Sequence, residues 1–119
     1  MYTISKQFSF SASHQLALLP ADHQCARLHG HNYIIEAVLC AETPNSVGFV
    51  RDYGELKEIG AYIDSTLDHR HLNDVFECNP TAENMAKVLY DKFKQSFPEL
   101  IAIRVSETSK TWAEYRCLL

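Results

Sequence analysis

Two stretches near the start of the chain alternate between hydrophobic and polar residues, which is typical of strands that bury one face. The hydrophobic members of residues 2–14 are Tyr2, Ile4, Phe8, Phe10 and Ala12. Those of residues 31–40 are Tyr33, Ile35, Ala37 and Leu39. Residues 44–48 are then rich in proline, asparagine, serine and glycine, which favour turns. The pattern predicts two half-buried strands followed by a turn.

The spacing of hydrophobic residues changes to a helical one in the middle of the chain. Residues 53–67 carry one apolar stripe, formed by Leu56, Ile59, Ile63 and Leu67. Asp52, followed three residues later by Glu55, resembles a capping box at the start of this helix. A second helix is expected to begin near residues 79–81 and to end before Pro98. Its apolar stripe is Ala82, Met85, Ala86, Leu89 and Phe93.

Strand-like alternation returns after Pro98, with Ile101, Ile103 and Val105 on one face, and a short fourth strand is expected at Trp112–Leu118. The order ββααββ predicts an α+β fold, an antiparallel four-stranded sheet with two helices on one face. We expect one domain over residues 1–119. Such a sheet has two open edges, and a closed ring of several sheets would pair them.

Composition narrows the functional classes. The chain has 119 residues, is 46% hydrophobic and carries a net charge of −4, which fits a globular protein without a basic surface for nucleic acid. No stretch approaches the ~20 apolar residues of a membrane span, and the first residues lack the layout of a signal peptide. We therefore expect a cytoplasmic protein with no membrane partner. The four cysteines include no CxxC pair and are interpreted as reduced thiols.

Three histidines form the candidate metal site. On a strand, His29 and His31 point to the same face, and His14 shares the parity of the apolar residues in its own strand. Three histidine ligands leave the fourth position of Zn²⁺ open, as in catalytic sites. The competing interpretation is a hydrogen-bonded core histidine at position 14 and a tight turn at residues 29–31. Cys25 is a fourth ligand, a catalytic thiol or a plain buried residue, and spacing does not decide among these.

Other polar residues are also candidates. Glu107 continues the apolar parity of the third strand, so it either lies at a frayed strand end or binds the paired N–H donors of a guanidine-like heterocycle. Asp68 and His69 follow the first helix, where an Asp–His pair can tune proton transfer. His23 and His71 lie near these motifs and are interpreted as supporting or solvent-facing residues.

The segments FSASHQL, CARLHGHNY, LDHRHLN, NPTAEN and SETS together resemble the 6-pyruvoyltetrahydropterin synthase and 6-carboxytetrahydropterin synthase family. The resemblance implies that His14, His29 and His31 bind zinc. It also implies that Cys25 removes a proton, that Asp68 and His69 relay it, and that Glu107 anchors the pterin. The family's tunnelling fold joins the sheets of three subunits into a barrel. Two trimers then form a homohexamer with sites between subunits.

The short spacing in CARLHGH resembles the carboxy branch of that family. It implies a zinc-dependent lyase that converts 7,8-dihydroneopterin triphosphate to 6-carboxy-5,6,7,8-tetrahydropterin, with release of acetaldehyde and triphosphate. This branch serves 7-deazaguanine and queuosine biosynthesis. The alternatives are a 6-pyruvoyltetrahydropterin synthase, which only eliminates triphosphate, a non-enzymatic zinc-binding barrel protein, and a metal-dependent hydrolase of another pterin ester.

Overall fold

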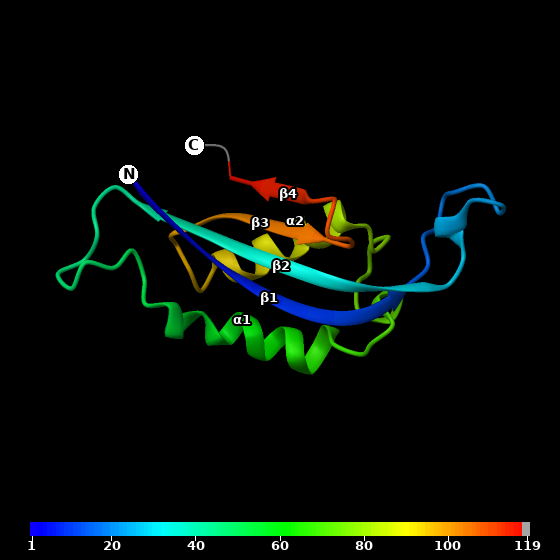
Figure 1. The fold of residues 1–119 in the computed structure, drawn as a ribbon, viewed down its shortest axis with the longest axis horizontal. Helices are drawn as coiled ribbons and strands as arrows, with labels where there is room; N and C mark the ends of the chain where they lie inside the picture. Colours follow the sequence, from blue (N-terminus) through cyan, green and yellow to red (C-terminus); the bar gives the residue numbers. More distant parts are fainter. Residues whose placement is uncertain (118–119) are drawn as a thin grey trace.

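Four antiparallel strands form one sheet in the order β1-β2-β3-β4 in the computed structural model, which describes residues 1–117 (Figure 1). The strands are β1 (Tyr2–His14), β2 (His29–Ala41), β3 (Leu100–Ser106) and β4 (Ala113–Arg116). The α-helices are α1 (Lys57–Tyr62) and α2 (Ala82–Lys94), both between β2 and β3 in the chain. The predicted order ββααββ is confirmed.

The two longest strands determine where the histidines lie. Strands β1 and β2 pair without interruption from Tyr2 opposite Ala41 to His14 opposite His29. Strand β2 therefore begins at His29, two residues before the predicted start. The sequence pattern did not predict this extension, because glycine, at position 30, has little intrinsic preference for strands. A Cβ atom at Gly30 would approach the carbonyl oxygen of Ala12 to 3.2 Å, so glycine permits a close approach there.

The predicted helix at 53–67 is present as three consecutive pieces. A 3₁₀ turn (Tyr53–Leu56) leads into α1, and a π turn (Ile63–Leu67) follows it. Asp52 caps the start by accepting a hydrogen bond from the N–H of Gly54, at 2.9 Å. The predicted capping box is wrong in its second half, because the Glu55 carboxylate pairs with Arg51 at 3.1 Å.

The second helix begins where the sequence predicted. Thr81 caps α2 by accepting a hydrogen bond from the N–H of Asn84, at 3.1 Å. Within residues 1–117, no helix has the length and apolar content that crossing a membrane requires.

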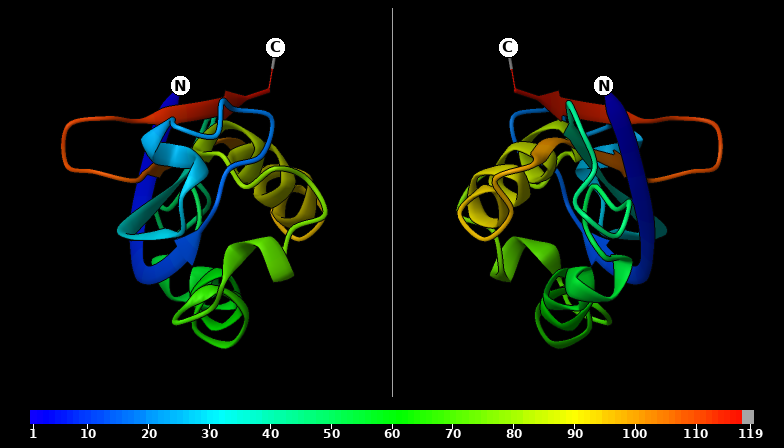
Figure 2. Two further views of the ribbon diagram at one scale, coloured as in Figure 1. Left: turned by 90° about the vertical axis from the view of Figure 1, so that its right-hand side faces the viewer. Right: turned by 90° about the vertical axis from the view of Figure 1, so that its left-hand side faces the viewer.

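Both helices pack on the same face of the sheet (Figures 1 and 2). The core between them is lined by Tyr33, Ile35, Leu39, Leu56, Ile59, Ile63, Met85, Leu89, Phe93, Ile103 and Val105. The opposite face carries a row of charged side chains. Arg104 contacts Glu36 at 2.8 Å and Glu114 at 3.6 Å. The predicted arrangement of two helices on one sheet face is confirmed.

One strand departs from simple alternation. The pairing of β2 with β3 shifts between Val38 and Leu39, so that Leu39 faces Leu100 and Ile101 is the extra residue of a bulge. As a result, Ile101 packs with Val38 and Ala102 on the helix-free face, against the predicted parity. Strand β4 ends at Arg116 and is shorter than predicted, while Leu118 lies outside the described residues.

Candidate functional site

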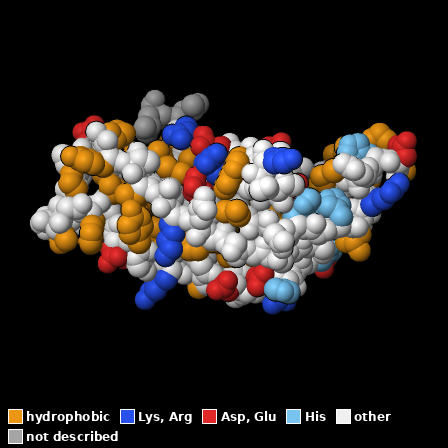
Figure 3. All heavy atoms as spheres, in the orientation of Figure 1, with side chains coloured by type: hydrophobic (Ala, Val, Ile, Leu, Met, Phe, Trp, Pro, Cys, Tyr) orange, Lys and Arg blue, Asp and Glu red, His pale blue; other side chains and the backbone are white. Residues whose placement is uncertain are grey.

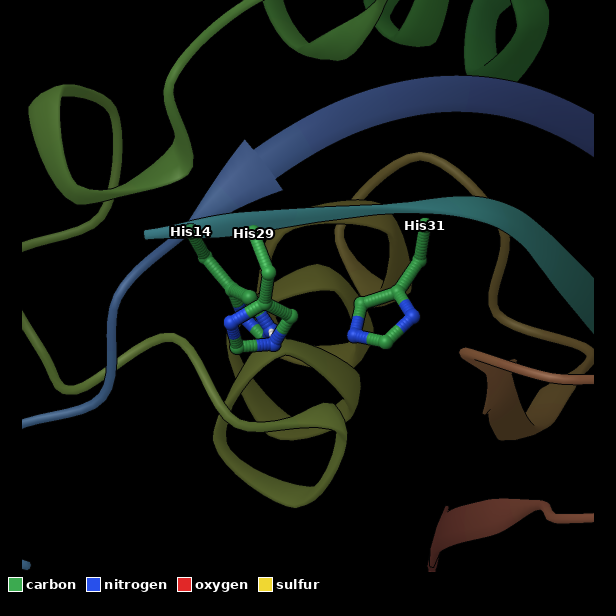
Figure 4. A group of neighbouring side chains, drawn as sticks. All are labelled: His14, His29 and His31. Atoms are coloured by element: carbon green, nitrogen blue, oxygen red, sulfur yellow. Dashed lines mark hydrogen bonds between the residues drawn. The ribbon is translucent and has the colours of Figure 1, made fainter. Parts of the chain in front are cut away.

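Three imidazole rings converge at the ends of β1 and β2 (Figure 4). His14 and His29 are directly opposite each other in the ladder, and His31 lies two residues further along the same face of β2. One ring nitrogen from each histidine lies within 4.8 Å of the other two. The strand pairing thus produces the predicted cluster. Within residues 1–117, this is the one group of histidine, cysteine or carboxylate side chains with a geometry that could hold a metal ion.

The hydrogen bonds of the imidazole rings determine which ring nitrogen carries the proton and which one can bind a metal. The Nδ1 atom of His14 lies 2.9 Å from the Pro80 carbonyl oxygen, and that of His29 lies 2.7 Å from the Arg27 carbonyl oxygen. Because a carbonyl oxygen only accepts, both Nδ1 atoms carry the proton. When both rings are neutral, the two Nε2 atoms, 2.9 Å apart, present lone pairs to each other. The Nε2 atom of His31 is buried without a hydrogen-bond partner. A cation among the three nitrogens would accept their lone pairs and so remove both the repulsion between them and the unsatisfied buried nitrogen. The residues therefore fit a metal ion.

Burial favours the neutral form of two of the three histidines. Desolvation lowers the pKa of His14 and of His31, while the charge of Glu107 opposes the shift in both cases. Metal binding requires deprotonated imidazole nitrogens, so a lowered pKa reduces the competition from protons. The nearby carboxylate would also stabilise a bound cation.

Glu107 lies beside the histidines, just after the end of β3. Its Oε2 atom is 3.5 Å from the Nε2 atom of His31. A cavity of about 180 Å³ borders Glu107 and is also lined by Glu83, Val105 and Trp112. The predicted parity of Glu107 therefore brings its carboxylate to the metal side of the sheet, next to a space for a small ligand.

Asp68 and His69 lie on the outer edge of β1. One Asp68 carboxylate oxygen accepts a hydrogen bond from the N–H of Ser11 at 3.0 Å, and the other lies 3.0 Å from Nδ1 of His69. The Ser11 hydrogen bond, and after it the contact with His69, lowers the pKa of Asp68. The His69 side chain is 83% exposed, and its φ of 58° lies in the left-handed region. The Asp68 and His69 side chains thus contact each other, with the imidazole directed to solvent.

Cys25 lies in the loop that joins β1 to β2, within a short 3₁₀ turn (Gln24–Ala26). The thiol is half-buried, and it is not a member of the histidine group. Within residues 1–117, no hydrogen bond or ion pair joins the Cys25 side chain to Asp68 or His69. Within the described residues, the Cys25 thiol is therefore joined neither to the histidine group nor to the Asp–His pair.

The two remaining histidines lie outside the histidine group. His23 accepts a hydrogen bond from the N–H of Cys25 at 3.0 Å, which orders the loop around the thiol. The Nδ1 atom of His71 lies 3.0 Å from the Ser13 hydroxyl, on the strand that carries His14. Each imidazole thus contacts a segment that carries a candidate site residue, Cys25 in one case and His14 in the other.

Several supporting residues escaped the sequence analysis. The side-chain amides of Asn73 and Asn79 each make two hydrogen bonds with the backbone that follows β1, at Gln15 and Ala17, and so hold the base of the loop. Pro80 contributes only its carbonyl oxygen, to His14. These contacts join residues more than 55 positions apart in the chain, so no local sequence pattern predicts them. The segment NPT does signal a helix start, which is what places Pro80.

Comparison with known proteins gives consistent matches over the whole length. Residues 3–117 match the family described as 6-pyruvoyl tetrahydropterin synthase. The 6-carboxy-5,6,7,8-tetrahydropterin synthase of Synechocystis is 33% identical over 122 residues, covering 97% of this chain and 93% of that protein. The 6-pyruvoyl tetrahydrobiopterin synthase of Dictyostelium discoideum is 31% identical over 99 residues, covering 78% and 73%. The structure of Caenorhabditis elegans 6-pyruvoyl tetrahydropterin synthase superimposes with a TM-score of 0.86 at 29% identity, covering 98% and 96%.

Proposed function

The chain belongs to the 6-pyruvoyl tetrahydropterin synthase family, and we propose that it is a zinc-dependent lyase of the 6-carboxytetrahydropterin type. Its reaction would convert 7,8-dihydroneopterin triphosphate and water to 6-carboxy-5,6,7,8-tetrahydropterin, acetaldehyde and triphosphate, as a step toward 7-deazaguanines such as queuosine. The convergence of three histidines beside Glu107 carries this proposal. The 33% identity to the Synechocystis 6-carboxytetrahydropterin synthase favours the carboxy branch.

Zinc is the metal that best suits this ligand set. His14, His29 and His31 offer three nitrogen ligands and no further protein ligand within the group, which matches a catalytic zinc site with an open position. When bound, Zn²⁺ would polarise an oxygen of the substrate side chain as a Lewis acid. The carbonyl groups of Pro80 and Arg27 would keep two of the rings in the correct tautomer and orientation.

The remaining site residues take their roles from their placement. We assign the removal of a carbon-bound proton to the Cys25 thiolate, because the thiol stays outside the metal group. Asp68 would orient His69, whose exposed imidazole is free to exchange protons with a second chain. Since no hydrogen bond or ion pair joins the Cys25 side chain to the Asp68–His69 pair within residues 1–117, a site completed by a neighbouring subunit would explain both positions.

The sheet itself supports an assembly of several copies. Strands β1 and β4 occupy the two outer positions of the sheet. The outer edge of β1 is hydrogen-bonded to residues 68–70 at Ser11 and Ser13, so β4 and the first part of β1 are the edges that present backbone groups to a further strand. Hydrophobic side chains gather at the end of the molecule away from the histidines (Figure 3). The exposed members of this end are Met1, Tyr2, Val47, Phe49 and Tyr53. We therefore propose sheets joined into a trimeric barrel and barrels stacked as a homohexamer.

The product distinguishes the two branches of the family. Incubated with 7,8-dihydroneopterin triphosphate, the zinc-loaded protein should yield 6-carboxy-5,6,7,8-tetrahydropterin together with an equal amount of acetaldehyde. Mass spectrometry of the pterin and an enzymatic assay of the aldehyde measure both. Accumulation of 6-pyruvoyltetrahydropterin without acetaldehyde would assign the chain to the pyruvoyl branch. Incorporation of water into an otherwise intact pterin side chain would indicate a hydrolase.

Glu107 provides a second test, of the pterin anchor. Replacing Glu107 with Gln should weaken pterin binding by about 1.5–3 kcal/mol, the range for a hydrogen bond to a charged group. The reason is that the neutral amide cannot accept two hydrogen bonds from paired N–H donors as a carboxylate does. Calorimetric titration with dephosphorylated 7,8-dihydroneopterin measures the change. Glu83→Gln is the control, because Glu83 is a second carboxylate that lines the same cavity. Equal affinities of the wild-type and Glu107→Gln proteins would exclude the anchor role.

A further inference from the structure

Tyr33 is the most deeply buried polar side chain near the histidines that has no role so far. It follows His31 by two residues on the same face of β2, and its side chain is fully buried. Its ring stacks on Phe10, its neighbour on β1, with centroids 4.9 Å apart. The ring also makes edge contacts with His31 at 5.5 Å and with His14 at 6.0 Å. Tyr33 therefore forms one wall of the histidine site.

The hydroxyl of Tyr33 is anomalous in this position. It is buried, and no residue within 1–117 forms a hydrogen bond with it. Leaving a buried hydroxyl without a partner costs about 1–3 kcal/mol. Phe10 shows that a ring without a hydroxyl packs well at the adjacent position. The packing of the core thus explains the ring of Tyr33 but not its oxygen.

Glu107 is the acceptor that the strand pairing brings toward this hydroxyl. Ile35 pairs with Val105 and Ile34 with Ser106, so Tyr33 and Glu107 are the next residues along the two segments, on the same face of the sheet. A phenol is protonated at neutral pH and is therefore a donor. The Glu107 carboxylate lies at 3.5 Å from Nε2 of His31, a distance at which no hydrogen bond forms. Its two oxygens provide about four lone-pair sites, more than one ligand edge uses. A donor on the buried side would fix the direction of the carboxylate.

We propose that Tyr33 is a positioning residue whose buried hydroxyl donates a hydrogen bond to Glu107 when a pterin is bound, directly or through one water molecule. This inference rests on the proposed role of Glu107 as the pterin anchor. In the free protein, the hydroxyl remains without a protein partner. In the complex, the Tyr33 hydroxyl orients the Glu107 carboxylate toward the N–H donors of the ligand. The new hydrogen bond then offsets the free-energy cost of burying this hydroxyl without a partner in the free protein.

The test is the Tyr33→Phe variant, which removes the hydroxyl alone. Its free energy of unfolding without ligand should equal or exceed that of the wild type, since an unpartnered buried group is lost. Its zinc content should be unchanged. Its affinity for dephosphorylated 7,8-dihydroneopterin should fall by about 5- to 15-fold, the effect of one hydrogen bond. In a Glu107→Ala background, Tyr33→Phe should cause no further loss, because the two residues act together.

Tyr90→Phe is the matched control. Tyr90 is a buried tyrosine of α2 that packs against Tyr115 at 5.2 Å, and its hydroxyl has a partner in Cys117. This variant should lose stability and keep its pterin affinity, the opposite of Tyr33→Phe. If the wild type binds the pterin and Tyr33→Phe binds it equally well, the positioning role is wrong and the anchor role stands. If the wild type does not bind the pterin, both fail.

Discussion

Replacing His29 with Ala is expected to remove zinc and turnover together. The Nε2 atom of His29 lies 2.9 Å from that of His14, at the centre of the only three-histidine group that the described residues form. Losing a supporting partner of a metal ligand typically weakens binding by 10- to 100-fold, so losing the ligand itself should cost at least about 100-fold in affinity. Metal analysis of the purified variant, beside an assay of acetaldehyde release, measures both effects.

His23→Ala is the control for the His29 substitution. His23 lies in the loop that precedes β2. Within residues 1–117 its imidazole accepts a hydrogen bond from the N–H of Cys25 and lies outside the histidine group. The control should retain zinc at the wild-type level. Circular dichroism should show that both variants are folded, since His29 is half-buried and its Nδ1 bonds only one carbonyl group, that of Arg27. A His29→Ala protein that retains one zinc ion per chain would exclude this group as the metal site.

Hydrophobic periodicity predicted the parts of this molecule in which local pattern and tertiary packing agree. The alternation along residues 2–14 became β1, and the same parity placed His14 opposite His29. The start of α2 was also predictable, because threonine is a preferred N-cap residue and the Thr81 side chain accepts a hydrogen bond from the first turn of the helix. In these cases the side chain preference of a short segment is sufficient to determine its structure.

Other features depend on pairing between distant segments. Ile101 has the hydrophobicity and parity of a core residue, yet the register of β3 against β2 makes it the extra residue of a bulge. The Asp68–His69 pair was recognisable as a motif, but its position on the outer edge of β1 depends on hydrogen bonds to Ser11 across 57 residues. A single sequence holds no local signal for such contacts.

The histidine site combines both situations. The spacing of His29 and His31 predicted a shared face, and strand pairing added His14, so the cluster itself was predictable. The role of Cys25 was not, because three residues, 26–28, separate the thiol from His29 and such a connection can fold toward or away from a metal. The structure places Cys25 in its own 3₁₀ turn outside the group. This position gives the proposed mechanism its sharpest test.

Replacing Cys25 with Ala is expected to separate metal binding from catalysis. If the three histidines are the complete protein ligand set, the variant keeps its zinc, because no ligand has been removed. Turnover should nevertheless fall by about 100-fold or more, the effect of losing a positioned general base. The measurements are zinc content, pterin affinity and the rate of acetaldehyde release. Zinc content and affinity should match the wild type, so that the whole change lies in kcat.

Cys40→Ala is the matched control for this substitution. Cys40 is a half-buried free thiol like Cys25, but it lies on β2 opposite Thr3, at the other end of the ladder from the histidines. Its loss should leave zinc and turnover unchanged. A Cys25→Ala protein that loses its zinc would show that the thiol is a fourth ligand, which would make the site structural. A variant that keeps both zinc and full turnover would assign proton removal to another group, and the exposed imidazole of His69 would then be the next candidate.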